Sequence, residues 1–124
     1  MKTILALTVI CFCISGIAVG QNVTAVEARV TPENHNGSCP MIFNVKGVIQ
    51  SGGAGTVGFR WERSDGFHTG VARYTFHGRE RKIVTYEWRL SKPFNVTYHG
   101  WVRLHVMGPG GMESPAAHFE LHCR

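Results

Sequence analysis

The sequence predicts an all-β domain, an antiparallel β-sandwich of immunoglobulin-like type with about seven strands and one disulfide. Three observations lead to this prediction. Apolar and polar residues alternate with a period of two in a series of short runs, and clusters of turn-forming residues separate these runs. The segment that holds them is about 100 residues long, the usual size of this fold. No segment keeps the period of 3.6 residues that an amphipathic helix would show.

The predicted strands follow one another along the whole chain after residue 22. The first, second and fourth have the weaker alternation and lie at 23–30, 41–49 and 71–77. In the third, fifth, sixth and seventh, at 57–62, 84–90, 101–106 and 117–122, every second residue is apolar. A period of two places these apolar side chains on one face of each strand, and they form the predicted core: Val57, Phe59 and Trp61; Val84, Tyr86, Trp88 and Leu90; Val102, Leu104 and Val106; Ala117, Phe119 and Leu121.

The predicted turns are rich in Gly, Pro, Asn, Asp and Ser, and they lie at 32–38, 51–55, 64–70, 78–80, 91–95 and 108–115. The glycine-rich segment 51–55 lacks the Lys and the helix that a phosphate-binding loop requires, so we interpret it as a hairpin turn. The basic segment 79–82 is interpreted as a further turn.

Residues 1–20 have the features of a secretory signal peptide. Lys2 supplies a positive charge, an apolar run extends from Ile4 to Ile14, and Ala18 and Gly20 are the small residues of a cleavage site. An uncleaved membrane anchor is the alternative, but the apolar run is shorter than the roughly 20 residues that span a bilayer. We therefore expect a secreted, extracellular protein with one domain at 21–124 and no transmembrane segment.

The cysteines indicate one disulfide. Cleavage of a signal peptide would remove Cys11 and Cys13 and leave Cys39 and Cys123, which most simply pair in an oxidising compartment. Both share the inward parity of their strands and would meet at one end of the sandwich if each strand reverses the last. A redox-active pair usually has the form Cys-x-x-Cys, which is absent here. Antibody domains bridge their second and sixth strands instead, although Trp61 occupies the strand on which their core Trp lies.

Several short motifs carry a resemblance to a known family. They are Cys39-Pro40, Trp61-Glu62-Arg63-Ser64-Asp65-Gly66, Trp88-Arg89-Leu90, Trp101-Val102-Arg103-Leu104-His105-Val106 and the final run from Phe119 to Cys123. With these motifs, the chain resembles small secreted β-sandwich domains of bacterial extracellular proteins. The resemblance implies an immunoglobulin-like fold in an extracellular setting, and it supplies no catalytic residue. As a stand-alone chain, it resembles centipede venom scoloptoxins of this bacterial-like type, which implies a venom toxin or another secreted effector.

Three asparagines begin Asn-x-Ser/Thr acceptor sites, namely Asn22, Asn36 and Asn95. If the chain is secreted, these sites predict a glycoprotein.

Composition excludes several functional classes. A chain of 124 residues with 44% hydrophobic and 17% charged residues is too short for a multidomain enzyme or a polytopic membrane protein. Asp65 is the only aspartate, and it lies in a predicted turn where Asp commonly bonds its own backbone. No nucleophile-elbow motif is present. We therefore expect a non-enzymatic protein without a cofactor.

The outward positions of the last two predicted strands form a candidate binding face. If these strands pair, one surface carries Trp101, Arg103 and His105 from one strand, and His118, Glu120 and His122 from the other. Exposed Trp and Arg are typical anchors of an interface, whereas an ordinary polar sheet face is the alternative. We predict no metal site, because His118 and His122 lie about 13 Å apart on one strand and cannot easily share an ion. The alternative is a site formed by one of them with Glu120 and His105.

The sequence thus favours a monomeric binding protein whose partner is an extracellular protein, a glycan or a membrane surface. A formal charge of +5 suits anionic partners, but a charge of this size is also normal for solubility. Nucleic acid is not expected outside the cell. The alternatives are a carbohydrate- or matrix-binding module that stacks a sugar on Trp101, and a protease inhibitor that presents residues 108–113.

Overall fold

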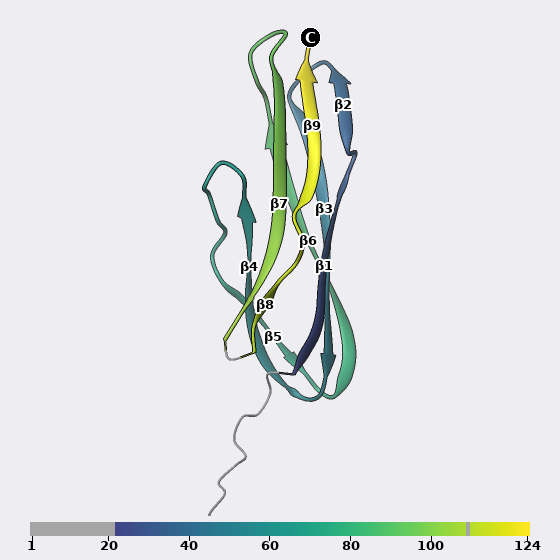
Figure 1. Ribbon diagram of the computed structural model, residues 1–124, viewed down its shortest axis with the longest axis vertical. Coiled ribbons are helices and arrows are strands. Elements are labelled where there is room, and N and C mark those ends of the chain that lie inside the picture. Colours follow the sequence, from purple (N-terminus) through teal and green to yellow (C-terminus); the bar gives the residue numbers. More distant parts are fainter. Residues whose placement is uncertain (1–21, 109) are drawn as a thin grey trace, which may run out of the picture.

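The computed structural model describes residues 22–108 and 110–124, which form two β-sheets around one core (Figure 1). The predicted signal peptide, residues 1–20, lies outside the described residues. Within the described part, no helix has the length and hydropathy needed to cross a bilayer. The chain is an immunoglobulin-like β-sandwich, as the alternating runs predicted.

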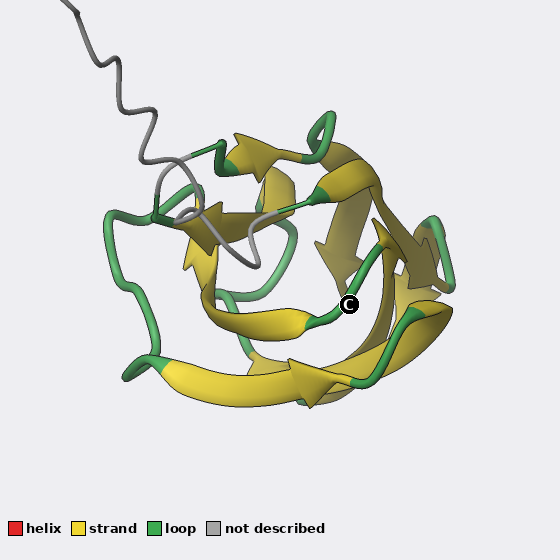
Figure 2. Cartoon of the chain, turned by 90° about the horizontal axis from the view of Figure 1, so that it is seen from below, coloured by secondary structure: helices red, strands yellow, loops and turns green. Residues whose placement is uncertain are grey.

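The smaller sheet has three strands in the order β1-β3-β6, all antiparallel. Its members are β1 (Val23–Thr31), β3 (Met41–Gly52) and β6 (Arg79–Leu90). The larger sheet has the order β2-β9-β7-β4-β5, with β8 paired to β7. It consists of β2 (Asn34–Gly37), β9 (Ala117–Cys123), β7 (Thr97–Met107), β4 (Gly55–Arg63), β5 (Ala72–Phe76) and β8 (Met112–Glu113). Seen along the strands, the two sheets curve around the shared interior (Figure 2).

All seven predicted strands are present, and two short strands lie in segments predicted as turns. The segment Asn-His-Asn-Gly of β2 has no strand pattern of its own and extends because it pairs in parallel with β9. The second, β8, forms where Met112 and Glu113 pair antiparallel with Val106 and His105 of β7. Neither pairing is visible in local sequence, because each depends on a strand elsewhere in the chain.

Two of the predicted turns are wrong. Residues 79–82 are not a turn but the start of β6, where they pair with the end of β3. Residues 51–55 do not form a hairpin turn, because β3 and β4 belong to different sheets and the segment crosses between them. The two strands face each other across the core: a Cβ atom at Gly47 would lie 2.7 Å from the ring of Trp61.

The predicted inward side chains form the core. Trp61 is 4% exposed, and Val102, Leu104 and Val106 of β7 are fully buried. The Phe43 and Phe119 rings, from opposite sheets, lie 4.3 Å apart between centroids. Alternation along each strand therefore identified the buried face correctly.

The predicted disulfide joins Cys39 to Cys123 at one end of the sandwich, with 5.5 Å between the two Cα atoms. Cys123 is 3% exposed and Cys39 is half-buried, so the bond lies at the rim of the core. It connects the start of the smaller sheet's central strand, β3, to the end of β9 in the larger sheet.

Candidate functional site

Trp101, Arg103 and His105 alternate on the outward side of β7, and all three are half-buried. They are half-buried because β4 lies next to β7, with Glu62 opposite Arg103 and Arg60 opposite His105. Outward side chains that are opposite each other in two antiparallel strands lie within contact distance. The structure therefore surrounds three of the predicted residues with charged groups that were not part of the predicted binding face.

Glu62 is the centre of this arrangement. Its Oε2 accepts hydrogen bonds from Arg60 Nε at 3.1 Å and Nη2 at 3.0 Å, and its Oε1 accepts one from Arg103 Nε at 2.9 Å. His105 Nδ1 lies 2.9 Å from Oε2. The Glu62 side chain is only 14% exposed, so these contacts replace most of its hydration.

The surroundings of Glu62 lower its pKa to about 2. Burial on its own would raise the pKa, because it disfavours the charged carboxylate. The hydrogen bonds from His105, Arg103 and Arg60 favour the charged form and together outweigh burial. Glu62 is therefore ionised throughout the physiological pH range.

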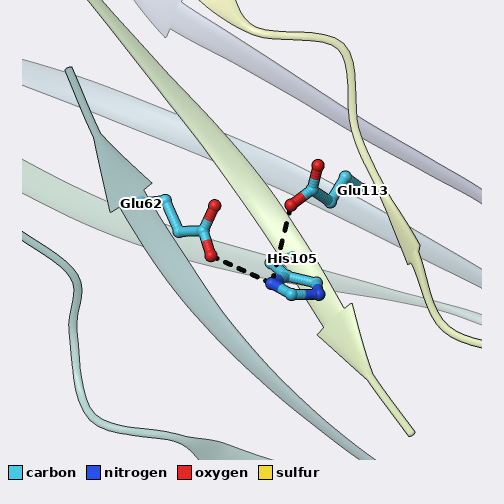
Figure 3. A group of neighbouring side chains, drawn as sticks. All are labelled: Glu62, His105 and Glu113. Atoms are coloured by element: carbon cyan, nitrogen blue, oxygen red, sulfur yellow. Dashed lines mark hydrogen bonds and ion pairs between the residues drawn. The ribbon is translucent and has the colours of Figure 1, made fainter. Parts of the chain in front are cut away.

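Glu113 on β8 completes the group, which we call the Glu62 cluster: Arg60, Glu62, Arg103, His105 and Glu113. Its Oε2 lies 3.6 Å from both Arg103 Nη2 and His105 Nδ1. Figure 3 shows both carboxylates directed at the imidazole of His105. Alternation could have placed Arg60 and Glu62 outward, but Glu113 lay in a predicted turn with no strand signal.

An open groove of about 290 Å³ runs beside the cluster. Two aromatic residues, Phe67 and Trp101, line it together with Arg60, Glu62 and Arg103. Phe67 is 49% exposed, and the Arg103 guanidinium lies 5.1 Å from the centroid of the Trp101 ring. The groove thus offers a second aromatic side chain, Phe67, beside the predicted Trp101. Phe67 was missed because it lies in the predicted 64–70 turn.

The 64–70 segment folds back on β4 and β7 through hydrogen bonds with the backbone of these two strands. Trp101 N donates to Ser64 Oγ at 3.1 Å, and Ser64 N donates to the Trp101 carbonyl at 3.0 Å. Trp61 N donates to Thr69 Oγ1 at 2.9 Å. Asp65 Oδ1 accepts from Phe67 N at 3.1 Å, which confirms the predicted turn role of this aspartate. These contacts hold Phe67 next to the groove.

Arg63 contacts the ring of Phe67. Its guanidinium carbon lies 4.3 Å from the ring centroids of both Phe67 and Trp88, and Nη1 donates to Tyr86 Oη at 3.0 Å. The hydrogen bond from Arg63 lowers the pKa of Asp65, and the same bond raises the pKa of Arg63. A cation between two rings favours a fixed position for the exposed one.

The two histidines of β9 lie at different distances from the groove along the sheet. His118 is opposite Trp101 in the β7–β9 register and is exposed. His122 lies four residues further along, opposite Thr97. Its Nδ1 is 2.6 Å from Thr97 Oγ1, and its Nε2 is 3.2 Å from Asn95 Oδ1. The five predicted residues share one sheet face, but His122 belongs to its far end.

The side chains of three residues that could bind a metal ion lie close together, although no metal site was predicted. One ligand atom each of Glu62, His105 and Glu113 lies within 4.8 Å of the others. Arg103 contacts both carboxylates, and Arg60 also bonds Glu62. A divalent cation would have to displace these guanidinium groups, so the geometry fits an ion-pair network better than a metal centre.

The asparagines of the three predicted glycosylation sites are all exposed. Asn22 precedes β1, Asn36 lies on β2, and Asn95 lies in the connection between β6 and β7. Exposure leaves each of them accessible to a glycosyltransferase.

The chain is similar to known proteins in its fold. No family model matches the sequence, and no curated protein matches it. Among solved structures, the CARDB domain of the PF1109 protein from Pyrococcus furiosus, in complex with di-metal ions, is similar with a TM-score of 0.55 and 11% identity. That match covers 85% of this chain and 97% of the other.

The alkylpurine DNA glycosylase AlkC of Pseudomonas fluorescens, bound to DNA containing an abasic site analog, matches with a TM-score of 0.56 and 14% identity. The match covers 79% of this chain but only 30% of the glycosylase chain. At these identities, both likenesses concern the sandwich architecture and not the residues of a site.

Proposed function

We propose that this chain is a secreted, non-enzymatic binding protein whose partner occupies the groove between Phe67 and Trp101. The observation that carries the proposal is the composition of this groove: two partly exposed aromatic rings beside the Glu62 cluster, which includes Arg103. Aromatic residues and arginine dominate the binding energy of most interfaces. The ion pairs would add directional hydrogen bonds at the edge of the aromatic contact.

The chemistry of the groove favours recognition over catalysis. A carboxylate with a pKa of about 2 that accepts several hydrogen bonds is a weak general base near neutral pH. Ser64 is the hydroxyl among the groove residues, and its Oγ contacts Tyr98 Oη at 2.8 Å and accepts from Trp101 N. No histidine activates this hydroxyl among the contacts of the described residues. Ser64 therefore supports the loop and is not prepared as a nucleophile.

Secretion is part of the proposal and rests on the signal-peptide features of residues 1–20 and on the Cys39–Cys123 disulfide. The resemblance to venom proteins supports a role as a toxin or another secreted effector. Exposure of Asn22, Asn36 and Asn95 is compatible with glycosylation in the secretory pathway.

A carbohydrate- or matrix-binding function is the second candidate. Sugar rings stack on exposed aromatic side chains, and charged side chains nearby hydrogen-bond to their hydroxyl groups. Phe67 and Trp101 beside Arg60, Glu62 and Arg103 provide both kinds of contact.

One pair of measurements tests both candidates. The full chain, expressed through a secretory pathway and labelled, is applied to a neutral-glycan array and to cultured animal cells. We expect Trp101→Ala and Phe67→Ala each to reduce binding at least tenfold on whichever surface the wild type binds. Phe94→Ala is the control, because Phe94 is 76% exposed and absent from the groove.

Saturable binding to the array would support the carbohydrate function, whereas binding to cells alone would support a protein partner. Equal binding by wild type and both groove variants would contradict the proposed site on either surface.

A further inference from the structure

The outward side of the smaller sheet carries a second feature, which is separate from the groove. Five basic residues lie on it, and we call them the basic face: Arg29 on β1, Lys46 on β3, and Arg79, Arg81 and Arg89 on β6. All five are exposed. The register supports one surface, because Arg29 is opposite Lys46 and Arg81 is opposite Gln50.

The cations of the basic face lack the side-chain partners that most other described Lys and Arg residues have. Elsewhere in the described part, Arg60, Arg63 and Arg103 form ion pairs with carboxylates. Lys82 and Lys92 lie over the rings of Tyr74 and Tyr98, and Arg124 donates to Asn36. The described Lys and Arg residues that have no such partner are Arg73 and the five members of the basic face.

The carboxylates on this side of the sheet do not neutralise it. Glu27 on β1 and Glu87 on β6 share the outward parity of the basic residues. Neither forms an ion pair with another described residue, and together they are outnumbered by the cations. The face therefore has a net positive charge, because its two carboxylates do not neutralise its five cations.

The shape of the surface offers a place for an anion. A hollow of about 240 Å³ is lined by Glu27, Arg29, Lys46, Val48 and Arg81. A second hollow, of about 420 Å³, lies at the end of the sheet, and its charged lining residues are Arg79, Glu80 and Arg81. Arg81 lines both, so the two hollows adjoin along β6.

We propose that the basic face binds a linear, sulfated polysaccharide. Arg79 and Arg89 lie about 33 Å apart along β6 at the usual rise of a strand, so the charge forms an elongated band that one small anion would only partly cover. The planar guanidinium of Arg donates two parallel hydrogen bonds to a sulfate or carboxylate group. A chain with anionic groups repeated along it matches this band.

An anionic membrane is the less favoured partner of the same charge. Helices and patches that bind lipid interfaces usually insert large apolar side chains such as Trp, Phe or Leu. The exposed large apolar residues on this face are Ile42 and Ile83, which lie between the cations on different strands. No aromatic residue stands among the outward positions of β1, β3 and β6.

The test measures affinity for a heparin oligosaccharide at about 0.15 M salt, with the intact disulfide-bonded protein. We expect the double variant Lys46→Gln/Arg81→Gln to bind about tenfold more weakly, because it removes two cations that line one hollow. The matched control, Arg73→Gln/Lys92→Gln, makes the same change in net charge away from the basic face and should lose less than twofold. Circular dichroism and thermal unfolding establish that both proteins are folded.

Three outcomes would overturn the proposal. Equal losses in the two double variants would mean that net charge alone attracts heparin. Tighter binding to phosphatidylserine-containing vesicles, or to duplex DNA of equal charge, would assign the face to a different polyanion. Loss of heparin binding in Trp101→Ala would place the polysaccharide in the groove, whereas retention is expected because the two sites lie on different sheets.

Discussion

Arg103 Nε donates a hydrogen bond to Glu62 Oε1 at 2.9 Å, between residues directly opposite each other on β7 and β4. The two residues are 41 positions apart in the chain, and the contact exists because the two strands are neighbours in the larger sheet. Three basic side chains converge on the one carboxylate of Glu62. Glu62 and Arg103 therefore have two roles: their ion pair links β4 to β7, and both side chains line the candidate groove.

Replacement of Glu62 by Gln keeps the shape and removes the charge. We expect Glu62→Gln to lower the free energy of unfolding by about 1–2 kcal/mol, because Arg60 and Arg103 lose a charged acceptor but remain partly hydrated. Urea denaturation measures the change. Glu87→Gln is the control, since Glu87 is an exposed strand residue without an ion pair in the described part, and its effect should stay within about 0.5 kcal/mol. Equal effects of the two substitutions would contradict a central role for Glu62.

The low pKa of Glu62 predicts a dependence of stability on pH. The value falls from 4.5, the ordinary value, to about 2 in the folded chain, so the unfolded state binds the proton more readily. The resulting stabilisation is complete above about pH 4.5 and is lost as the pH falls toward 2. After allowance for solvent in the open groove, we expect about 2 kcal/mol from this residue.

Unfolding of wild type and Glu62→Gln from pH 5 to pH 2 checks this prediction. The difference in stability between them should shrink as the pH falls. Asp65 contributes acid sensitivity of the same sign, because its pKa is also lowered, but it does so in both proteins. A constant difference across this pH range would exclude the assigned ionisation of Glu62.

The disulfide should contribute strongly to stability, since it closes a loop between residues 84 positions apart. Replacement of both Cys39 and Cys123 by Ser should lower the free energy of unfolding by about 4 kcal/mol, mainly by freeing the unfolded chain. For a domain of this size, such a loss removes much of the total stability. Thermal unfolding measures the loss, and thiol titration of the unfolded wild type before and after reduction checks the bond. Equal thiol counts would show that the bond is absent.

A side chain at Gly47 should destabilise the sandwich. A Cβ atom there would lie 2.7 Å from both Leu104 Cδ2 and Trp61 Cη2 across the core, closer than real Cβ contacts allow. Gly47→Ala is therefore expected to cost about 1–3 kcal/mol through overpacking. Gly78→Ala is the matched control, because no atom beyond its two chain neighbours lies within 4 Å of a Cβ at Gly78. Similar melting temperatures for the two variants would mean that the sheets separate easily at Gly47.

Local alternation was sufficient to predict the strands and the face of each that is buried. Trp61, Leu104 and Phe119 are buried because successive side chains of any strand point to opposite sides, a property of the backbone that needs no knowledge of its neighbours. The same parity placed Cys39 and Cys123 inward, and the structure joins them. The 51–55 crossing, the 79–82 strand and β2 were not predictable in this way, since each depends on which strand lies beside it.

The fold class, the core and the disulfide could be predicted from the sequence, because they follow from the local period of two and from the pairing chemistry of two thiols. The candidate site could not be predicted in this way, because its residues meet through the pairing of strands and the folding of a loop. Glu62 meets Arg103 through the β4–β7 register, Glu113 reaches His105 through β8, and Phe67 reaches the groove through a loop folded on β7. Strand order and register depend on how two curved sheets pack on one core, and residues distant in the chain determine that packing.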